Sequence, residues 1–412
     1  MASCLAWAAP LTVVSATADA DDQIALPAPL AVGDAIRIAT GRRADLVAAR
    51  ARASAAAERP ALVSALDDPQ VFPSIDHAPF MGGGADLSFA IEQSFPLSHV
   101  RAHRRHAAEA DARRARADVD RVGLDVELDA ASAFWMLAET RDTASILDEQ
   151  RALAEQMVSA ATARYATSTA TQAEVLRAQL EVARLDGERR AVAAELRAAE
   201  AMLNTSLARA VDAPIPTLEP PPDDDPPPVA QVAGAALARR PELRAGSAEI
   251  ARSEADVSVM QSMYTPMAMV RTGPSYTMSD GAGWMVMVGI SIPLWRGKLA
   301  AGVAEARAMV AMSHADLDAM RRMVNGQAAV ARERLVAARE RYVALRDNIV
   351  PRAKQASAAT LAAYAANQVA LVSTLDVAQA LWSAERDLVM ARAELGRAWA
   401  RLRRATGERV TQ

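Results

Sequence analysis

The sequence predicts a mainly α-helical protein with a small β part, in which a helix–β-hairpin–long helix–helix unit occurs twice. Three observations lead to this fold class. Short motifs recur in the same order about 197 positions apart. Long stretches repeat apolar residues with helical spacing, and two short segments alternate apolar and polar residues as strands do.

The composition favours long helices over compact globular domains. The 412 residues are 51% hydrophobic, only 4% aromatic and 23% charged, a profile typical of long helices packed along stripes of small residues. Basic residues are almost all arginine, since Lys298 and Lys354 are the only lysines. The formal net charge is −4 and acids interleave the basic runs, so no nucleic-acid partner is expected.

Residues 1–20 are predicted to be a secretory signal peptide. An uncharged apolar stretch ends there in Ala18-Asp19-Ala20, the A-x-A pattern of such signals. The positive n-region is missing, so a disordered N-terminus is the alternative and the true start codon stays open. Cys4 is the only cysteine, which excludes an internal disulfide; whether it belongs to the precursor or is lipidated stays open. No run of 18 apolar residues follows, so transmembrane helices are not expected.

Two structural repeats make up the rest of the chain, at residues 21–212 and 230–412. Three matches in the same order indicate the duplication. Arg42-Arg43-Ala44-Asp45-Leu46 and Ser94-Phe95-Pro96-Leu97 recur 197 positions later as Arg239-Arg240-Pro241-Glu242-Leu243 and Ser291-Ile292-Pro293-Leu294, and Tyr165 recurs 199 positions later as Tyr364. Residues 213–229 are a proline-rich linker, because proline lacks the backbone donor that a helix or central strand needs.

Each repeat is predicted to contain a β-hairpin, at about residues 66–97 and 264–295. The second strand of each hairpin alternates apolar with polar or small residues. The apolar positions are Leu87, Phe89, Ile91 and Phe95 in the first and Trp284, Val286, Val288, Ile290 and Ile292 in the second. Glycine-containing turns precede these strands, at Gly82–Gly84 and Asp280–Gly283.

Helices surround each hairpin. The first is predicted from about Val32 to Arg59, ending before Pro60. The long helices and their partners are predicted at about residues 99–165 and 172–208, and again at 298–364 and 374–404. The first long helix would be on the order of 100 Å long at 1.5 Å per residue. Pro351 lies inside the second long helix, where it should kink or locally unwind it.

Four strands with one apolar face form an open sheet with two raw edges. A membrane β-barrel has no edges, because unpaired backbone groups find no water there, and closed barrels need at least about eight strands. Several chains must therefore pool their strands. We expect a trimer that forms a 12-stranded membrane β-barrel on a long α-helical barrel.

Several motifs resemble those of the TolC-like outer-membrane efflux proteins, and the resemblance covers essentially the whole mature chain. They are RPEL at Arg240–Leu243, YxP at Tyr264–Pro266, IPLW at Ile292–Trp295, and a tip sequence of Ile349-Val350-Pro351, Tyr364, Leu375-Asp376 and Gln379. The family has glycine three residues after each tip tyrosine, where this chain has Ser168 and Asn367. Asparagine tolerates the left-handed conformation well and serine less so.

The resemblance implies a passive channel subunit of a tripartite efflux system in the outer membrane of a Gram-negative bacterium, with its helices in the periplasm. The implied partners are two further copies of the chain, a periplasmic adaptor, a proton-driven inner-membrane pump and outer-membrane lipid. No catalytic motif is found, so we expect neither an enzyme nor a cofactor. The alternatives are a drug or other small-molecule duct of the same fold and a periplasmic coiled-coil adaptor, although an adaptor would lack the duplicated hairpins.

Methionine-rich segments suggest a cargo. The chain has 17 methionines, and many lie in or near the second hairpin. Thioethers are soft ligands suited to Cu(I) and Ag(I), and strand alternation would place Met285 and Met287 on the face opposite Trp284. These two residues are candidate metal contacts, with flexible packing as the alternative. The methionines and IPLW together resemble copper/silver or cobalt–zinc–cadmium efflux subunits more than drug-efflux ones.

His99, His103 and His106 are a second candidate metal group. Their i, i+4, i+7 spacing places them on one helix face. Neighbouring arginines would repel a cation, so polar residues at the membrane–periplasm boundary are the favoured interpretation.

The turns that join the paired helices are the expected adaptor contacts, and their candidate residues are Tyr165, Ser168, Tyr364 and Asn367. Asp376 follows the second turn, where the resemblance implies an acid lining the periplasmic gate. Three copies would form a negative ring that favours cations. An acid that simply stabilises the start of a helix is the alternative.

Overall fold

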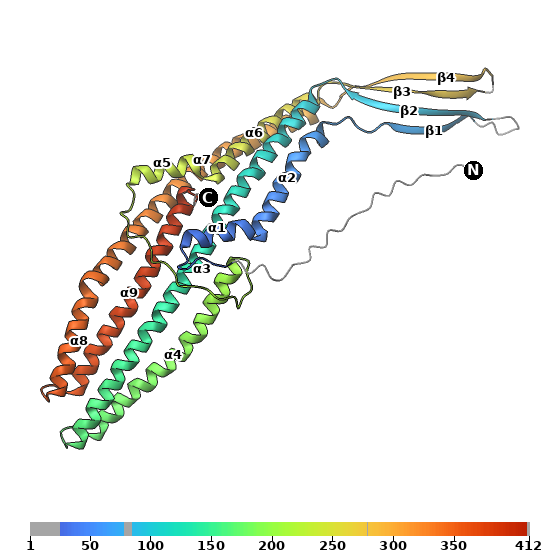
Figure 1. Cartoon of the computed structure of the whole chain (residues 1–412). Helices are drawn as coiled ribbons and strands as arrows, with labels where there is room; N and C mark the ends of the chain where they lie inside the picture. Colours follow the sequence, from blue (N-terminus) through green and yellow to red (C-terminus); the bar gives the residue numbers. More distant parts are fainter. Residues whose placement is uncertain (1–24, 78–84, 278, 410–412) are drawn as a thin grey trace, which may run out of the picture.

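The computed structural model describes residues 25–77, 85–277 and 279–409. It is elongated, with a β-sheet at one end and paired long helices at the other (Figure 1). The first repeat comprises α1 (Val32–Arg42), α2 (Ala44–Ser64), β1 (Gln70–His77), β2 (Asp86–Pro96), α3 (Val100–Ala166) and α4 (Gln172–Ser206). The second comprises α5 (Val229–Arg239), α6 (Pro241–Ser262), β3 (Met267–Thr277), β4 (Gly281–Ser291), α7 (Arg296–Ala344), the π-helical turn η1 (Leu345–Ile349), α8 (Val350–Ala365) and α9 (Leu371–Thr406). The fold is mainly helical and duplicated, as the sequence predicts.

Some sequence-based expectations lie outside the described residues. They are the signal peptide with Cys4, and the first glycine turn at residues 82–84. None of the described helices is both long and apolar enough to cross a membrane.

The prediction of one helix from Val32 to Arg59 is wrong in two respects. The helix breaks at Arg43, whose backbone is extended at φ −61° and ψ 127°, so α1 and α2 are separate. The same break occurs at Arg240, where the following proline disfavours helical geometry; Ala44 gives no such signal in the first repeat. In addition, α2 does not end before Pro60 but continues to Ser64. Pro60 removes one helical hydrogen bond on an exposed last turn, where water can satisfy the carbonyl.

The prediction that Pro351 locally unwinds the second long helix is confirmed. The residues just before it, Leu345–Ile349, form a π-helical turn. Because proline has no N–H, it cannot donate to the carbonyl of Asp347, and the chain widens to bonds such as Val350 N–H to Leu345 O. By contrast, α3 runs uninterrupted for 67 residues, about 100 Å at 1.5 Å per residue.

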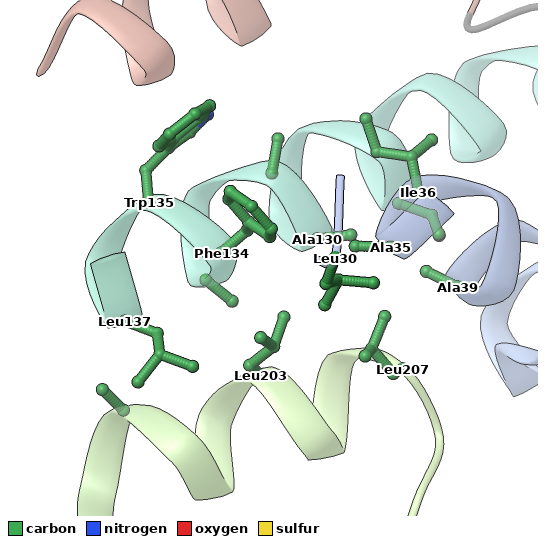
Figure 2. Packing of buried hydrophobic residues seen from close by; sticks show 14 residues of the cluster. Leu30, Ala35, Ile36, Ala39, Ala130, Phe134, Trp135, Leu137, Leu203 and Leu207 are labelled. Carbon is green, nitrogen blue, oxygen red and sulfur yellow. The ribbon is translucent and has the colours of Figure 1, made fainter. Parts of the chain in front are cut away.

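The main hydrophobic core lies where α1, α3 and α4 meet (Figure 2). We call this region the waist of the molecule. Phe134 and Leu137 of α3, Leu203 of α4 and Leu207, the C-cap of α4, have no exposed surface. Leu30, just before α1, completes the cluster and is held by the linker: its N–H donates to Thr217 O at 2.8 Å, and its carbonyl accepts from Glu219 N at 3.0 Å. The linker is thus bound to the first repeat at this point.

A glycine lets α9 pack closely against this core. The Phe134 and Trp135 rings form an edge-to-face pair with centroids 4.8 Å apart, and the Trp135 ring packs against Gly396 of α9. A Cβ at Gly396 would lie 2.2 Å from Cε2 of Trp135, which is well inside van der Waals contact.

Gly396→Ala is therefore expected to lower the free energy of unfolding by about 1–3 kcal/mol, the usual cost of overpacking. The matched control is Gly326→Ala in α7, where nothing lies within 4 Å of the added Cβ and the better helix propensity of alanine should stabilise by up to about 1 kcal/mol. Denaturant titration followed by circular dichroism compares the two. If both variants shift the midpoint in the same direction, close packing at Gly396 is not the cause.

A second structural feature of the waist is an ion network built on the RPEL motif. Arg240 is only 6% exposed. It pairs with Glu242 at 2.9 Å and donates to Gln327 Oε1 and to the carbonyl oxygens of Arg404 and Ala405. Arg404 in turn pairs with Glu242 at 2.8 Å. One motif therefore joins α6, α7 and the end of α9.

The network makes acid stability depend on Glu242. Burial alone would raise the pKa of this carboxyl, but its backbone hydrogen bond together with Arg404 and Arg240 outweighs burial and holds the pKa below its ordinary value. Its stabilisation is therefore complete above the unfolded-state value near pH 4.5 and is lost as the pH falls through the folded pKa.

Glu242→Gln is expected to destabilise the protein at pH 7, with the difference from the wild type shrinking as the pH falls below about 4.5. Unfolding free energies measured between pH 7 and pH 3 test this. Glu333→Gln is the control, because the Glu333 side chain is 65% exposed. A wild-type–variant difference for Glu242 that stays constant with pH would contradict the interpretation.

Candidate functional site: the sheet and the helical tips

The four strands form one antiparallel sheet in the order β1-β2-β3-β4. The two hairpins join through β2 and β3, with Leu87 opposite Tyr276 and Phe95 opposite Ala268. Within the described part of the chain, β1 and β4 each pair with a single strand, so each presents an edge of backbone donors and acceptors. Both edges and the whole sheet project beyond the helices (Figure 1).

One face of the sheet is apolar and exposed. The register places the outward side chains of all four strands on this face. Its exposed residues are Val71, Ile75, Leu87, Phe89, Ile91, Phe95, Tyr276, Trp284, Val286, Val288 and Ile290. The indole N–H of Trp284 donates to Thr272 Oγ1 at 2.8 Å, so this side chain needs no water on an apolar surface. Such an extended apolar face is suited to contact with lipid or another protein.

The opposite face is polar. The hydroxyls of Ser74 and Ser88 lie 2.6 Å apart, and Arg271 pairs with Glu92 at 2.6 Å. The Arg271 guanidinium lies 4.5 Å from the centre of the Phe72 ring, in cation–π geometry.

Met285 and Met287 lie on this polar face, opposite Gly273 and Arg271 in the register. Their position agrees with strand alternation, and Met287 is the cross-strand neighbour of Arg271, which pairs with Glu92. Whether they contact a metal stays a prediction.

The three histidines lie at or near the start of α3, just beyond the sheet. His99 precedes the helix, and the Nδ1 atom of His106 lies 3.4 Å from Glu109 Oε2. Among the described residues, no group of three or more His, Cys, Asp or Glu side chains is placed to hold a metal ion. The structure thus does not bring the three histidines together as a site.

The two helical tips have the turn geometry that the motif requires. Ser168 and Asn367 both adopt positive φ, at 58° and 60°, which is the left-handed conformation that favours glycine. The two tyrosines differ: Tyr165 is half exposed, whereas Tyr364 is completely buried. The duplicated tips are therefore alike in backbone and unlike in environment.

Tyr364 packs in an apolar cluster with Ala178 and Leu371, and Arg164 covers its ring, a contact that sequence reasoning missed. The Arg164 guanidinium lies 4.3 Å from the centre of the Tyr364 ring and donates to Tyr364 O, Thr169 O and Asn367 Oδ1. The Tyr364 hydroxyl donates to Glu174 at 3.3 Å, and its pKa is raised by burial, with Arg164 opposing and Glu174 adding to the shift. The first repeat thus holds the second tip. The repeat comparison could have signalled this, since Ala363 stands where Arg164 would recur.

Arg164→Ala is expected to lower the free energy of local opening of both tips by about 2 kcal/mol, the typical contribution of a desolvated cation–π contact or a charged hydrogen bond. Amide hydrogen exchange in residues 165–171 and 364–370 should then accelerate roughly 30-fold. Arg177→Ala, an exposed position on α4, is the control. Unchanged exchange in residues 364–370 would show that Arg164 does not hold the second tip.

Asp376 lies on an exposed stripe of α9 with Val372 and Gln379, six residues beyond Ala370, the N-cap of that helix. The stripe is free to face a pore or a partner. Its role in gating stays a prediction.

The chain is similar to known outer-membrane proteins, in part of its sequence and in its fold. Residues 232–408 match the family described as Outer membrane efflux protein. No curated protein shows significant sequence similarity to the chain.

Solved structures share the fold over most of the chain. The outer-membrane channel OprN matches with 19% identity and a TM-score of 0.78, covering 92% of this chain and 90% of that one. CusC, whose structures concern transmembrane channel formation, matches with 14% identity and a TM-score of 0.79, covering 91% of each chain. The outer-membrane protein VceC from Vibrio cholerae matches with 17% identity and a TM-score of 0.76, covering 91% of this chain and 96% of that one.

The chain therefore has the fold of these solved outer-membrane channel proteins. The second repeat also matches the sequence family of outer-membrane efflux proteins.

Proposed function

We propose that the chain is the outer-membrane channel subunit of a tripartite efflux system. The observation that carries this proposal is the sheet, which has one exposed apolar face, one polar face and two edges. Three copies would join β1 of one chain to β4 of the next, closing a barrel of twelve strands with lipid outside and the polar face inside. The helices would continue the duct into the periplasm.

The partners follow from the same arrangement. The helical tips lie at the far end from the sheet (Figure 1), so they are suited to dock a periplasmic adaptor through residues such as Tyr165, which is half exposed. An inner-membrane pump, proton-driven in our proposal, would supply the energy. Asp376, exposed on α9, would line the periplasmic gate in three copies.

Heavy-metal cations are the cargo we propose. Met285 and Met287 lie on the face that would line the barrel, and thioethers suit soft cations such as Cu(I) and Ag(I). Arg271, opposite Met287, is paired with Glu92, so its charge is offset close to the methionines. A drug duct of the same fold is the alternative outcome.

Metal tolerance in a deletion strain tests the proposal. Strains with and without the gene are compared on graded copper, silver, zinc, cobalt, cadmium and common drugs. Sensitivity to one metal group, restored by the wild-type gene but less well by Met285→Leu/Met287→Leu, supports metal export. Met323→Leu on α7, an exposed methionine outside the sheet, is the control. Sensitivity to drugs alone would keep the channel and exclude the metal cargo.

A further inference from the structure

The segment where β4 leads into α7 carries apolar and basic side chains in close succession. Ile292, Leu294 and Trp295 are exposed, with Trp295 at 79%, and Arg296 and Lys298 follow at exposed positions. The first turn of α7 has no acidic residue, and the next acid along the helix is Glu305. We call residues 292–298 the crossing segment.

The crossing segment continues the apolar face of the sheet. The last residue of β4, Ser291, pairs with Met267, and Ile292 and Leu294 extend the series of exposed apolar side chains beyond it. Tyr264, 40% exposed, precedes β3, whose first residue Met267 pairs with Ser291, so it lies at the same end of the sheet as the crossing segment. Where an apolar face ends against a bilayer, tryptophan and tyrosine lie at the headgroup level, and basic side chains reach the phosphates.

The equivalent segment of the first repeat has a different charge pattern. Leu97 is exposed there, but the Arg101 Nε donates to the carbonyl of Ser64 at 2.7 Å. The exposed carboxylates of Asp67 and Asp68 lie in the loop that follows α2, and Gln93 of β2 binds the Asp67 carbonyl at 2.8 Å. The first crossing thus carries acids as well as basic residues such as Arg104 and Arg105, whereas the second has basic and apolar residues and no acid from Ile292 to Ala304.

We infer that the crossing segment binds the headgroup of an anionic phospholipid in the leaflet nearest the helices. Arg296 and Lys298 hold the phosphate, while Trp295 and Leu294 lie against the glycerol and upper acyl chains. Charge complementarity and continuity with the apolar face both support this occupant. The inference rests on the proposed function, because it requires the sheet to be in a membrane.

The test uses the full-length assembled protein and vesicles of phosphatidylcholine with or without phosphatidylglycerol. Insertion into pure phosphatidylcholine vesicles is measured first by protease protection of the sheet. Phosphatidylglycerol binding to the protein in nanodiscs is then measured for the wild type and for Arg296→Ala/Lys298→Ala. Each basic residue near a membrane surface strengthens anionic lipid binding about fivefold, so the double variant should bind roughly 25-fold more weakly.

The control variant is Arg307→Ala/Arg322→Ala, which removes two exposed arginines farther along α7 and should leave lipid binding unchanged. The wild-type preference for phosphatidylglycerol should also weaken as salt is raised, a readout that requires no variant. Inorganic phosphate at millimolar concentration should not displace the lipid, because it lacks the apolar part that Trp295 and Leu294 contact.

The outcomes separate the two hypotheses. If the protein does not enter either kind of vesicle, the proposed channel function fails. If it enters both but shows no phosphatidylglycerol preference, or if the control variant loses the preference equally, the lipid inference is wrong and the channel stands. Displacement of phosphatidylglycerol by inorganic phosphate would show that the segment binds anions in general, and would overturn the lipid assignment.

Discussion

Arg240→Ala is expected to lower the free energy of unfolding by about 3–5 kcal/mol, the cost of breaking one partner out of a buried ion pair. The substitution would leave Glu242, whose side chain is 13% exposed, with Arg404 as its remaining basic partner in the network. It would also remove the donor to the carbonyls of Arg404 and Ala405, which lie in the last turn of α9. Arg240→Lys should recover little, because an ammonium cannot reproduce the planar fork of donors.

The repeat supplies a matched control. Arg43 stands at the equivalent position and pairs with Asp45 and with Asp129, the latter at 3.2 Å, but both carboxylates are more than half exposed. Arg43→Ala should therefore cost no more than about 1 kcal/mol. Urea titrations of both variants, extrapolated to water, measure the difference. Equal losses of unfolding free energy at the two positions would mean that burial does not determine how much the motif arginine contributes to stability.

Local patterns in the sequence predicted much of the fold. The duplicated motifs located the two repeats, and period-two alternation identified the apolar face of β4 before its register was known. The tip turns were also located from Tyr165 and Tyr364, and the observed positive φ at Ser168 and Asn367 shows that neither residue prevents the turn. These features depend on neighbouring residues, so a single sequence carries them.

Features that depend on distant residues could not be predicted. The break at Arg43 has no local signal, since Ala44 follows it where proline follows Arg240. Likewise, the contact of Arg164 with Tyr364 joins residues 200 positions apart. The repeat comparison marks Arg164 as a residue without a counterpart, but nothing in the pattern around it indicates its partner. Asp376 illustrates a further limit, because a gate made by three copies depends on contacts beyond one chain.

The two repeats are stabilised by different interactions at the waist. The first packs an aromatic pair, Phe134 and Trp135, into the waist, whereas the core cluster of the second repeat contains small and aliphatic residues such as Ala331 and Leu335. The second repeat instead uses the Arg240 network at this level. Loss of either feature should therefore destabilise the same region by a different mechanism: loss of Phe134 leaves a cavity, and loss of Arg240 removes one partner of a buried ion network.

Phe134→Ala is the corresponding cavity prediction, with an expected loss of about 3–5 kcal/mol. Phe134 is fully buried among Leu30, Leu203 and neighbouring residues (Figure 2), and the backbone bonds that hold Leu30 to the linker limit how far the site can collapse. Unlike the loss in Glu242→Gln, this loss should not change between pH 7 and pH 3, because no titrating group is removed.

Met136→Ala is the control for this variant, since Met136 lies two positions along the same helix and is 41% exposed, so its truncation should cost about 1 kcal/mol or less. Urea titration across the pH range measures both variants. A loss for Phe134→Ala below about 1.5 kcal/mol would show that α1 and the linker close over the gap, and that the waist is more adaptable than its packing indicates. A loss that varies with pH would instead tie the aromatic core to the Arg240 network through α9, because Gly396, which packs against Trp135, is on the same helix as Arg404.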